Sequence, residues 1–338
     1  MADDDGGVEL PSRARISEVT GSRPVAVLSG GAQGIGYLVA RELARTHRIA
    51  LLDVEADEVR RAAEACGPDA IGVPCDIIQQ AEVEWAVARI VKETGGIDVV
   101  VSGAGIGAGG SSRLVDPDVL AAQLSINVTG NWRFIHACLP HVIERRGYVL
   151  GISSGAATAP TVGLGGYCSS KAAIEMLLEV LHLEVAHLGV DVGIACFLFM
   201  DTAMVRNAQQ FVPAFRQAVM NEPGPMHDVH PAHDAARAIV DAIRKRGHHA
   251  FAPGYLEGIS AARMALRTEL ASSAAKRQAE EIDRLTADSV AERGPLAGAM
   301  TPTLASRVAA RSIGRDFEAA GPLPRATCGA LTNVPPPM

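Results

Sequence analysis

Apolar runs and amphipathic stretches alternate along the chain from residue 24 to residue 255, which predicts strands and helices in turn. Pro24-Val-Ala-Val-Leu-Ser29 is typical of a buried strand, and residues 37–45 follow with apolar positions at helical spacing. Further apolar runs occupy residues 48–53, 70–76 and 97–105. Strands that alternate with helices usually build a parallel sheet with helices on both faces. We therefore expect one doubly wound parallel sheet of the α/β class.

A glycine-rich turn joins the first predicted strand to the first predicted helix. Gly30, Gly34 and Gly36 let the backbone turn sharply and approach a pyrophosphate, and free amides at the helix start attract its negative charge. The spacing is Gly-x-x-x-Gly-x-Gly, which differs from the Gly-x-Gly-x-x-Gly of the general dinucleotide fingerprint. The turn indicates a Rossmann-type nucleotide site, and a purely structural loop is the alternative for the turn taken alone.

An acidic residue ends the second apolar run. Asp53 stands about twenty residues beyond the turn, where a carboxylate accepts hydrogen bonds from an adenosine ribose and repels a 2′-phosphate. Neither Gln33 nor Val54 offers a basic side chain to offset that repulsion, so we expect NAD rather than NADP. Asp53 could also cap the next helix, which is compatible with this role. Asp76, which ends the third run, is placed to face the adenine.

A tyrosine and a lysine stand four residues apart in Tyr167-Cys-Ser-Ser-Lys171, with Ser154 upstream. A phenol has an unperturbed pKa of about 10 and is a poor acid or base at neutral pH. A lysine one helical turn away lies on the same face and favours the phenolate by its charge, which makes the pair a usable proton donor and acceptor. A surface helix contact is the alternative for such a pair taken alone.

The order and spacing of these motifs resemble the short-chain dehydrogenase/reductase family, in its NAD-preferring main branch, over roughly residues 24–255. The resemblance implies that Tyr167 exchanges a proton with the substrate oxygen while a hydride moves to or from the nicotinamide. Lys171 would lower the pKa of the tyrosine and hold the nicotinamide ribose. Ser154, preferred to Ser153 because alternate side chains point to opposite faces of a strand, would hydrogen-bond the substrate oxygen. Asn127 would hold a water that relays protons from Lys171.

The resemblance also implies which residues contact NAD. They lie in the glycine turn, at the strand ends, in the catalytic pair and after the sixth predicted strand: Ser29, Gly30, Gln33, Gly34, Ile35, Gly36, Asp53, Asp76, Ile77, Gly103, Ala104, Gly105, Tyr167, Lys171 and Thr202.

Three positions depart from the family pattern. Ser102-Gly-Ala-Gly105 replaces the usual Asn-Asn-Ala-Gly, so amide side chains that brace the central strands are lost and we expect weaker local stability. Phe197 and Leu198 stand where a Pro-Gly pair is usual, which puts a different backbone path beside the nicotinamide. Ser29 replaces a threonine and retains its hydroxyl.

Aromatic and methionine side chains gather after the sixth predicted strand in a chain otherwise poor in aromatics. In the resembled family this stretch forms the lid and wall of the substrate cleft. We expect an apolar cleft for a lipophilic secondary alcohol or ketone, such as a cyclic, terpenoid-like or steroid-like compound, and simple burial of the lid helix is the alternative. The expected pocket residues are Phe197, Leu198, Phe199, Met204 and Phe211, in a stretch that also holds Met200, Val212 and Phe215.

The 338 residues divide into one catalytic domain with additions at both ends. We expect a flexible N-terminal tail over residues 1–22, the Rossmann-type catalytic domain over 23–255, peripheral helices over 256–293 and a mobile tail rich in Pro, Gly and Ala over 294–338. The polar N-terminal residues do not form a secretory signal.

Charge and composition exclude several classes of partner. A net charge of −7 without a basic block disfavours nucleic acid, and no apolar run approaches a membrane span. Six cysteines without Cys-x-x-Cys spacing suggest reduced thiols in a cytoplasm. His248 and His249 have no cysteine or acidic partner at ligand spacing, so we expect exposed histidines and no metal site.

The sequence therefore predicts an NAD-dependent oxidoreductase that interconverts a lipophilic secondary alcohol and a ketone. By resemblance, it would form a homodimer or homotetramer through helices near residues 123–145 and 167–188. Two alternatives stay open. One is a non-catalytic nucleotide-binding regulator on the same fold, and the other is an epimerase or lyase that uses the same tyrosine.

Overall fold

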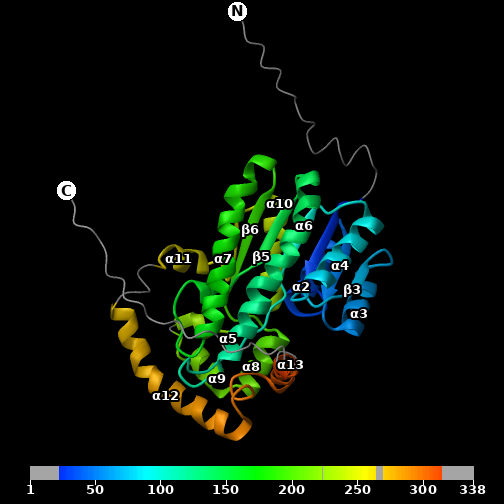
Figure 1. Ribbon diagram of the computed structural model, residues 1–338. Coiled ribbons are helices and arrows are strands. Elements are labelled where there is room, and N and C mark those ends of the chain that lie inside the picture. The colour runs from blue at the N-terminus through cyan, green and yellow to red at the C-terminus, as the bar shows by residue number, and fades with distance from the viewer. Residues whose placement is uncertain (1–22, 223, 264–268, 314–338) are drawn as a thin grey trace, which may run out of the picture.

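The computed structural model describes residues 23–222, 224–263 and 269–313. Within this part of the chain, seven strands form one parallel sheet in the order β3-β2-β1-β4-β5-β6-β7 (Figure 1). The strands are β1 (Val25–Ser29), β2 (Arg48–Asp53), β3 (Ile71–Pro74), β4 (Val99–Ser102), β5 (Tyr148–Ile152), β6 (Asp191–Phe197) and β7 (His249–Ala252). The order reverses direction between β1 and β4. Ligands of such sheets bind at the carboxyl ends of the strands beside this reversal.

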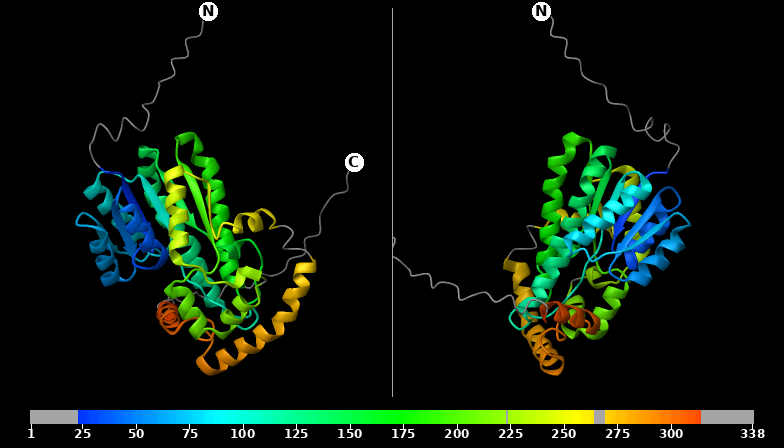
Figure 2. Two further views of the ribbon diagram at one scale, coloured as in Figure 1. Left: turned by 180° about the vertical axis from the view of Figure 1, so that it is seen from behind. Right: turned by 45° about the vertical axis from the view of Figure 1, so that its right-hand side comes forward.

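Helices cover both faces of the sheet, as the alternating pattern predicts (Figures 1 and 2). One face packs against α4 (Gln80–Thr94), α6 (Asn131–Arg145) and α7 (Gly165–Val185). The other packs against α2 (Gly34–Leu43), α3 (Ala56–Cys66) and α10 (Ala232–Lys245). The remaining helices and turns are α5 (Pro117–Leu124), η1 (Ser125–Gly130), η2 (Gly155–Ala157), η3 (Ala186–Leu188), α8 (Ala203–Phe211), α9 (Pro213–Met220), η4 (Gly224–His227), α11 (Leu256–Ala261), α12 (Glu269–Arg293) and α13 (Pro302–Ile313).

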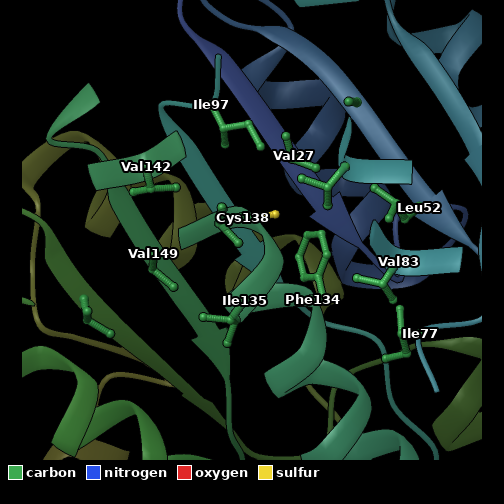
Figure 3. Packing of buried hydrophobic residues seen from close by; sticks show 14 of the residues in the cluster. Val27, Leu52, Ile77, Val83, Ile97, Phe134, Ile135, Cys138, Val142 and Val149 are labelled. Atoms are coloured by element: carbon green, nitrogen blue, oxygen red, sulfur yellow. The ribbon is translucent and has the colours of Figure 1, made fainter. Parts of the chain in front are cut away.

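The core between the sheet and α6 is close-packed (Figure 3). Phe134 and Cys138 of α6 are fully buried and lie among Val27 of β1, Leu52 of β2 and Val83 of α4. Full burial of a side chain such as that of Phe134 contributes about 1.5 to 3 kcal/mol. This packing fixes α6, and with it the π-helical turn η1 that continues α6 toward its N-terminal side, against the centre of the sheet.

The two helical segments expected to mediate self-association are long helices. The first runs without interruption through α5, η1 and α6, and the second is α7 with its extension η3. Met176, Val180 and Leu183 on α7 are exposed, and their spacing places them on one side of the helix. Self-association through this side remains a prediction.

The C-terminal region differs from the predicted mobile tail. After the expected peripheral helices, residues 302–313 form α13, whose Val308 packs with Ala299 and Met300 against Ala108 and Val119 of the main domain. The high proportion of small residues hid this element, because Ala and Ser supply few of the bulky apolar positions that mark an amphipathic helix. The expected tails over residues 1–22 and 314–338 lie outside the described residues.

Within the described part of the chain, no helix combines the length and the apolar character that crossing a membrane requires.

Candidate active site

The glycine turn links the carboxyl end of β1 to α2. Gly30 has a φ of +68°, and a Cβ there would lie 2.8 Å from backbone atoms of Ala104. A Cβ on Gly36 would lie 2.3 Å from the carbonyl oxygen of Gly30. Only glycine fits either position. The N-cap residue Gln33 makes no side-chain cap, so the first amides of the ten-residue helix α2 face outward as donors.

The two strand-end acids adopt fixed conformations. Asp53 accepts a hydrogen bond from the Ala32 amide at 3.2 Å and another from the Glu55 amide at 3.2 Å, which holds its carboxylate beside the glycine turn. Burial raises the pKa of Asp53 above its ordinary value. Asp76 accepts from the Ile78 amide at 3.2 Å, in a turn like that of Asp53.

The residues after β4 are braced by a residue that the sequence analysis did not identify. The Asn131 amide donates to the carbonyl oxygen of Ala104 at 2.7 Å, and its Oδ1 accepts from the Ser102 hydroxyl at 2.6 Å. Ser29 accepts from the Gly103 amide at 3.2 Å. An amide on α6 thus performs the bracing that the substitution at Ser102 removed from the strand. The expected local weakness is therefore offset, and only the tertiary structure brings Asn131 to this strand.

Ser154, Tyr167 and Lys171 converge beyond the carboxyl end of β5. Tyr167 lies in the first turn of α7, and a hydrogen bond with the Ser154 side chain acts on its hydroxyl. The Lys171 Nζ donates to the Ile152 carbonyl oxygen at 2.9 Å and lies 5.8 Å from the centre of the Tyr167 ring. Ser153 points elsewhere, because its hydroxyl donates to Glu175 Oε2 at 2.7 Å.

Burial determines the proton affinities of the catalytic pair. It raises the pKa of Tyr167 to about 12, although the hydrogen bond with Ser154 acts in the opposite direction. It lowers the pKa of Lys171 to about 8. The sequence predicted that Lys171 would lower the pKa of the tyrosine. In this structure the desolvation of the phenol is the larger effect, so the Tyr167 hydroxyl is protonated at pH 7.

Asn127 lies within η1 and is fully buried. Its Nδ2 donates to the Ile106 carbonyl oxygen at 2.9 Å and to the Ser170 hydroxyl at 3.0 Å, while its Oδ1 accepts from the Ile106 amide at 2.8 Å. Both amide hydrogens are therefore used to hold the loop after β4 against α7. A water relay through Asn127 remains a prediction, and the contacts themselves support a positioning role.

An apolar pocket opens beside Tyr167 and Ser154. Its apolar lining comes from the loops after β4 and β5, from the end of β6 and the segment that follows it, and from α8, α9 and η4: Gly107, Ala108, Gly155, Ala156, Ala159, Leu164, Phe197, Leu198, Phe199, Met204, Val205, Ala208, Phe215 and Met226. Four of the five expected pocket residues belong to this lining. Phe211, the last residue of α8, does not.

The rest of the aromatic and methionine stretch divides between the pocket and the core. Phe215 meets Phe199 edge-on, with ring centres 6.0 Å apart. Met200 and Val212 are buried, and neither lines the pocket. Phe197 and Leu198 line the pocket, so the residues that replaced Pro-Gly form part of its wall.

Glu222 and Thr161 bring polar groups to the pocket. The Thr161 hydroxyl donates to Glu222 Oε1 at 2.9 Å, and burial raises the pKa of Glu222. No motif marks either residue in the sequence. They come from separate loops that only the folded lid brings together.

The remaining expected cofactor residues lie around the same strand ends. Gln33, Gly34 and Thr202 line a hollow in front of the glycine turn, together with Arg206. A Cβ on Gly105 would lie 3.2 Å from Asn127 Oδ1 and 3.8 Å from Lys171 Nζ, so the backbone of Gly105 passes directly beside these two side chains. Ile35 and Ile77 pack against the core on opposite faces of the sheet.

Comparison with known proteins supports the assignment that the motifs suggest. The family model for short chain dehydrogenase matches residues 24–212. The chain is similar to 2,3-dihydro-2,3-dihydroxybenzoate dehydrogenase of Bacillus subtilis, with 32% identity over 175 residues, 50% of this chain and 67% of that protein. It is also similar to the oxidoreductase UcpA of Escherichia coli, with 32% identity over 215 residues, 61% of this chain and 80% of that protein.

The fold is likewise that of solved structures. The structure of a short chain dehydrogenase/reductase from Burkholderia phymatum in complex with NAD superposes with a TM-score of 0.65 at 21% identity, covering 72% of this chain and 94% of that one. The family model spans more than half of this chain, and the ordered motifs occupy one parallel sheet. The protein is a member of the short-chain dehydrogenase/reductase family of oxidoreductases.

Proposed function

We propose that this protein is an NAD(H)-dependent oxidoreductase that interconverts a secondary alcohol and a ketone. The observation that carries the proposal is the convergence of Ser154, Tyr167 and Lys171 at the mouth of an apolar pocket, beyond the carboxyl end of β5. The glycine turn lies at the same edge of the sheet, because β1 and β5 both flank β4.

The residues of the turn fit a dinucleotide. The glycine positions that tolerate no Cβ and the uncapped N-terminus of α2 would hold a pyrophosphate. Asp53 would accept hydrogen bonds from the adenosine ribose, and its charge favours NAD over NADP. Lys171 would hold the nicotinamide ribose, and Thr202, whose methyl group lies near Gly34, would contact the carboxamide. The cofactor, when bound, supplies the hydride acceptor or donor.

The residues of this chain perform the proton chemistry. In ketone reduction, the neutral Tyr167 donates its phenolic proton to the carbonyl oxygen, and Ser154 stabilises the charge that develops there. In alcohol oxidation, Tyr167 accepts the hydroxyl proton instead. Lys171 supplies a positive charge close to the tyrosine in both directions, and Asn127 holds the loop that borders the pair.

The pocket favours a lipophilic substrate that also carries a polar group. Phe199, Phe215 and Met226 offer apolar surface, and each buried methylene contributes roughly 0.8 kcal/mol to binding. Glu222 is the one acidic side chain in the described lining. A substrate hydroxyl that donates to its carboxylate would offset the cost of burying that group. A cyclic, terpenoid-like or steroid-like alcohol or ketone with a second hydroxyl meets both requirements.

A screen of hydrophobic alcohols and ketones, with and without a second hydroxyl, tests the proposal by the absorbance of the reduced nicotinamide. We expect stoichiometric NADH formation from an alcohol. Tyr167→Phe should lower turnover at least about a thousandfold while NAD still binds, because it removes only the proton donor.

Tyr148→Phe is the matched control. It removes an equally buried hydroxyl, which donates to the Gly247 carbonyl oxygen away from the pocket, and it should leave turnover nearly unchanged. Near-normal turnover in Tyr167→Phe would contradict the mechanism. NAD binding without turnover on any substrate would favour a regulator, and product formation without net NADH would favour an epimerase or lyase.

A further inference from the structure

Glu179, in the second half of α7, meets two consecutive histidines that lie far from it in the sequence, His248 and His249. The His248 Nε2 lies 2.9 Å from Glu179 Oε2, and the His249 Nε2 lies 3.3 Å from Glu179 Oε1. One ligand atom from each residue lies within 4.8 Å of the others. Glu179 is 69 residues before His248, so ligand spacing along the chain could not reveal this partner.

The hydrogen bonds of His248 place two acceptor atoms opposite each other, so a positively charged species is needed between Glu179 and His248. The His248 Nδ1 lies 2.8 Å from the Val192 carbonyl oxygen, which can only accept, so Nδ1 carries the hydrogen. In the neutral ring, Nε2 then presents a lone pair to the carboxylate. Two acceptors at this distance repel each other unless a proton or a metal ion lies between them. A backbone carbonyl that fixes the tautomer in this way is typical of metal-binding histidines.

The distances between the ligand atoms of these three residues suit the binding of one shared metal ion. Nitrogen and oxygen ligands that each lie about 2.0 to 2.2 Å from zinc are roughly 3 to 3.5 Å apart. A third imidazole stands next to the group, because the His182 ring lies over that of His248 with centres 4.1 Å apart. The Nδ1 of His182 is buried and has no hydrogen-bond partner among the described residues.

We propose that Glu179, His248 and His249 form a binding site for a divalent metal ion of the zinc type. Two imidazoles and one carboxylate form a donor set that zinc accepts, with a remaining position for water.

The site would join α7 to the edge strand β7. Glu179 lies eight residues after Lys171, so at 1.5 Å per residue the ion would lie about 12 Å along the helix from the catalytic lysine. That distance separates the ion from the proton chemistry. The expected consequence of binding is therefore greater stability of the folded state, since a ligand that binds only the native protein stabilises it.

Zinc chloride titrated by calorimetry into protein freed of metal by chelation tests the proposal. We expect one ion per chain with a dissociation constant of roughly 10 µM or tighter. His249→Ala and the isosteric Glu179→Gln should each weaken binding at least about tenfold. Zinc should also raise the melting temperature of the unmodified protein more than that of either variant.

His187→Ala is the matched control, because it removes an exposed histidine of η3 that lies outside the cluster, and it should bind zinc like the unmodified protein. The absence of saturable zinc binding would overturn the proposal and leave a protonated His248 paired with Glu179. Unchanged affinity in both His249→Ala and Glu179→Gln would overturn it as well. Cobalt(II) bound in place of zinc should lack thiolate absorption, and strong thiolate absorption would place the ion at a cysteine instead.

Discussion

Burial moves the pKa values of Tyr167 and Lys171 in opposite directions, upward for the phenol and downward for the ammonium group. A pKa of about 12 keeps the phenol protonated at pH 7, and a pKa of about 8 leaves roughly nine-tenths of the lysine charged. The resting protein is therefore prepared to give a proton to a carbonyl oxygen. Oxidation instead needs the scarce phenolate.

This asymmetry predicts opposite pH profiles for the two directions. The phenolate fraction rises tenfold per pH unit below the pKa of Tyr167, so alcohol oxidation should accelerate about tenfold per unit up to about pH 8. Above that pH, Lys171 loses its proton and the rate of alcohol oxidation should level off. Ketone reduction uses the neutral phenol and should stay nearly flat to about pH 8, then decline. Initial rates in both directions between pH 6 and pH 10 measure this, and a reduction rate that climbs with pH would contradict it.

The position of Asp53 predicts a preference for NAD over NADP. A carboxylate that faces a 2′-phosphate in a partly desolvated pocket costs on the order of 1 to 3 kcal/mol, about ten- to a hundredfold in affinity. NAD should therefore bind more tightly than NADP by that factor, and Asp53→Ala should narrow the gap. Fluorescence titration of both cofactors decides the matter. Equal affinities in the unmodified protein would rule out this role.

At the scale of elements, the segment from β6 through α9 forms one wall of the pocket. Thr202 caps α8 by accepting from the Val205 amide at 3.4 Å, and α8 begins beside the glycine turn, since Thr202 is the nearest contact of a Cβ on Gly34. The segment from β6 through α9 is thereby anchored beside the glycine turn. Among its aromatic residues, Phe199 and Phe215 line the pocket, and Phe211 at the end of α8 does not.

This division predicts a contrast between two phenylalanines of the lid segment. Catalytic efficiency should rise about fourfold for each carbon added along a series of secondary alcohols, which corresponds to about 0.8 kcal/mol per methylene. Phe199→Ala should reduce that gain to less than about twofold per carbon. Phe211→Ala should leave the slope unchanged. Higher catalytic efficiency on short, charged or sugar-like substrates would contradict an apolar cleft lined by Phe199. An equal change of slope in the two variants would contradict it as well.

At the scale of the whole molecule, the C-terminal helices fold back over the pocket walls. Ile282 of α12 is fully buried among Leu164, Ala214 and Ala218, in the cluster that also contacts Phe215. The Thr286 hydroxyl accepts from the Ser111 amide at 2.9 Å, which ties α12 to the loop after β4. Views from two further directions show α12 and α13 along this end of the domain (Figure 2).

This arrangement predicts that α12 shapes the pocket without touching substrate. Ile282→Ala should cost about 2 to 5 kcal/mol of packing, lower the melting temperature and raise KM more than it lowers kcat. NAD affinity should change by less than about twofold, because the glycine turn lies on other elements. Glu281→Ala, an exposed change on the next residue, is the control. A large loss of NAD affinity in Ile282→Ala would show that α12 supports the whole site rather than the lid.

The sequence by itself determined the sheet, the glycine turn and the candidate catalytic residues Ser154, Tyr167 and Lys171. These features rest on local physics: apolar runs mark buried strands, glycines mark close backbone approaches, and four-residue spacing places Tyr167 and Lys171 on one helix face. The strand limits predicted near Ser29 and Asp53 match those of β1 and β2, since a polar residue ends each run.

Only the tertiary structure decided the features that depend on distant residues. Asn131 replaces the amide lost at Ser102, Glu222 lines the pocket from a loop, Phe211 is not part of the pocket lining, and Glu179 reaches His248 and His249. It also set the direction of the Tyr167 pKa, because desolvation depends on everything that packs around the phenol. Local spacing constrains neighbours along a helix or strand, whereas burial and long-range contacts arise only when the whole chain has packed.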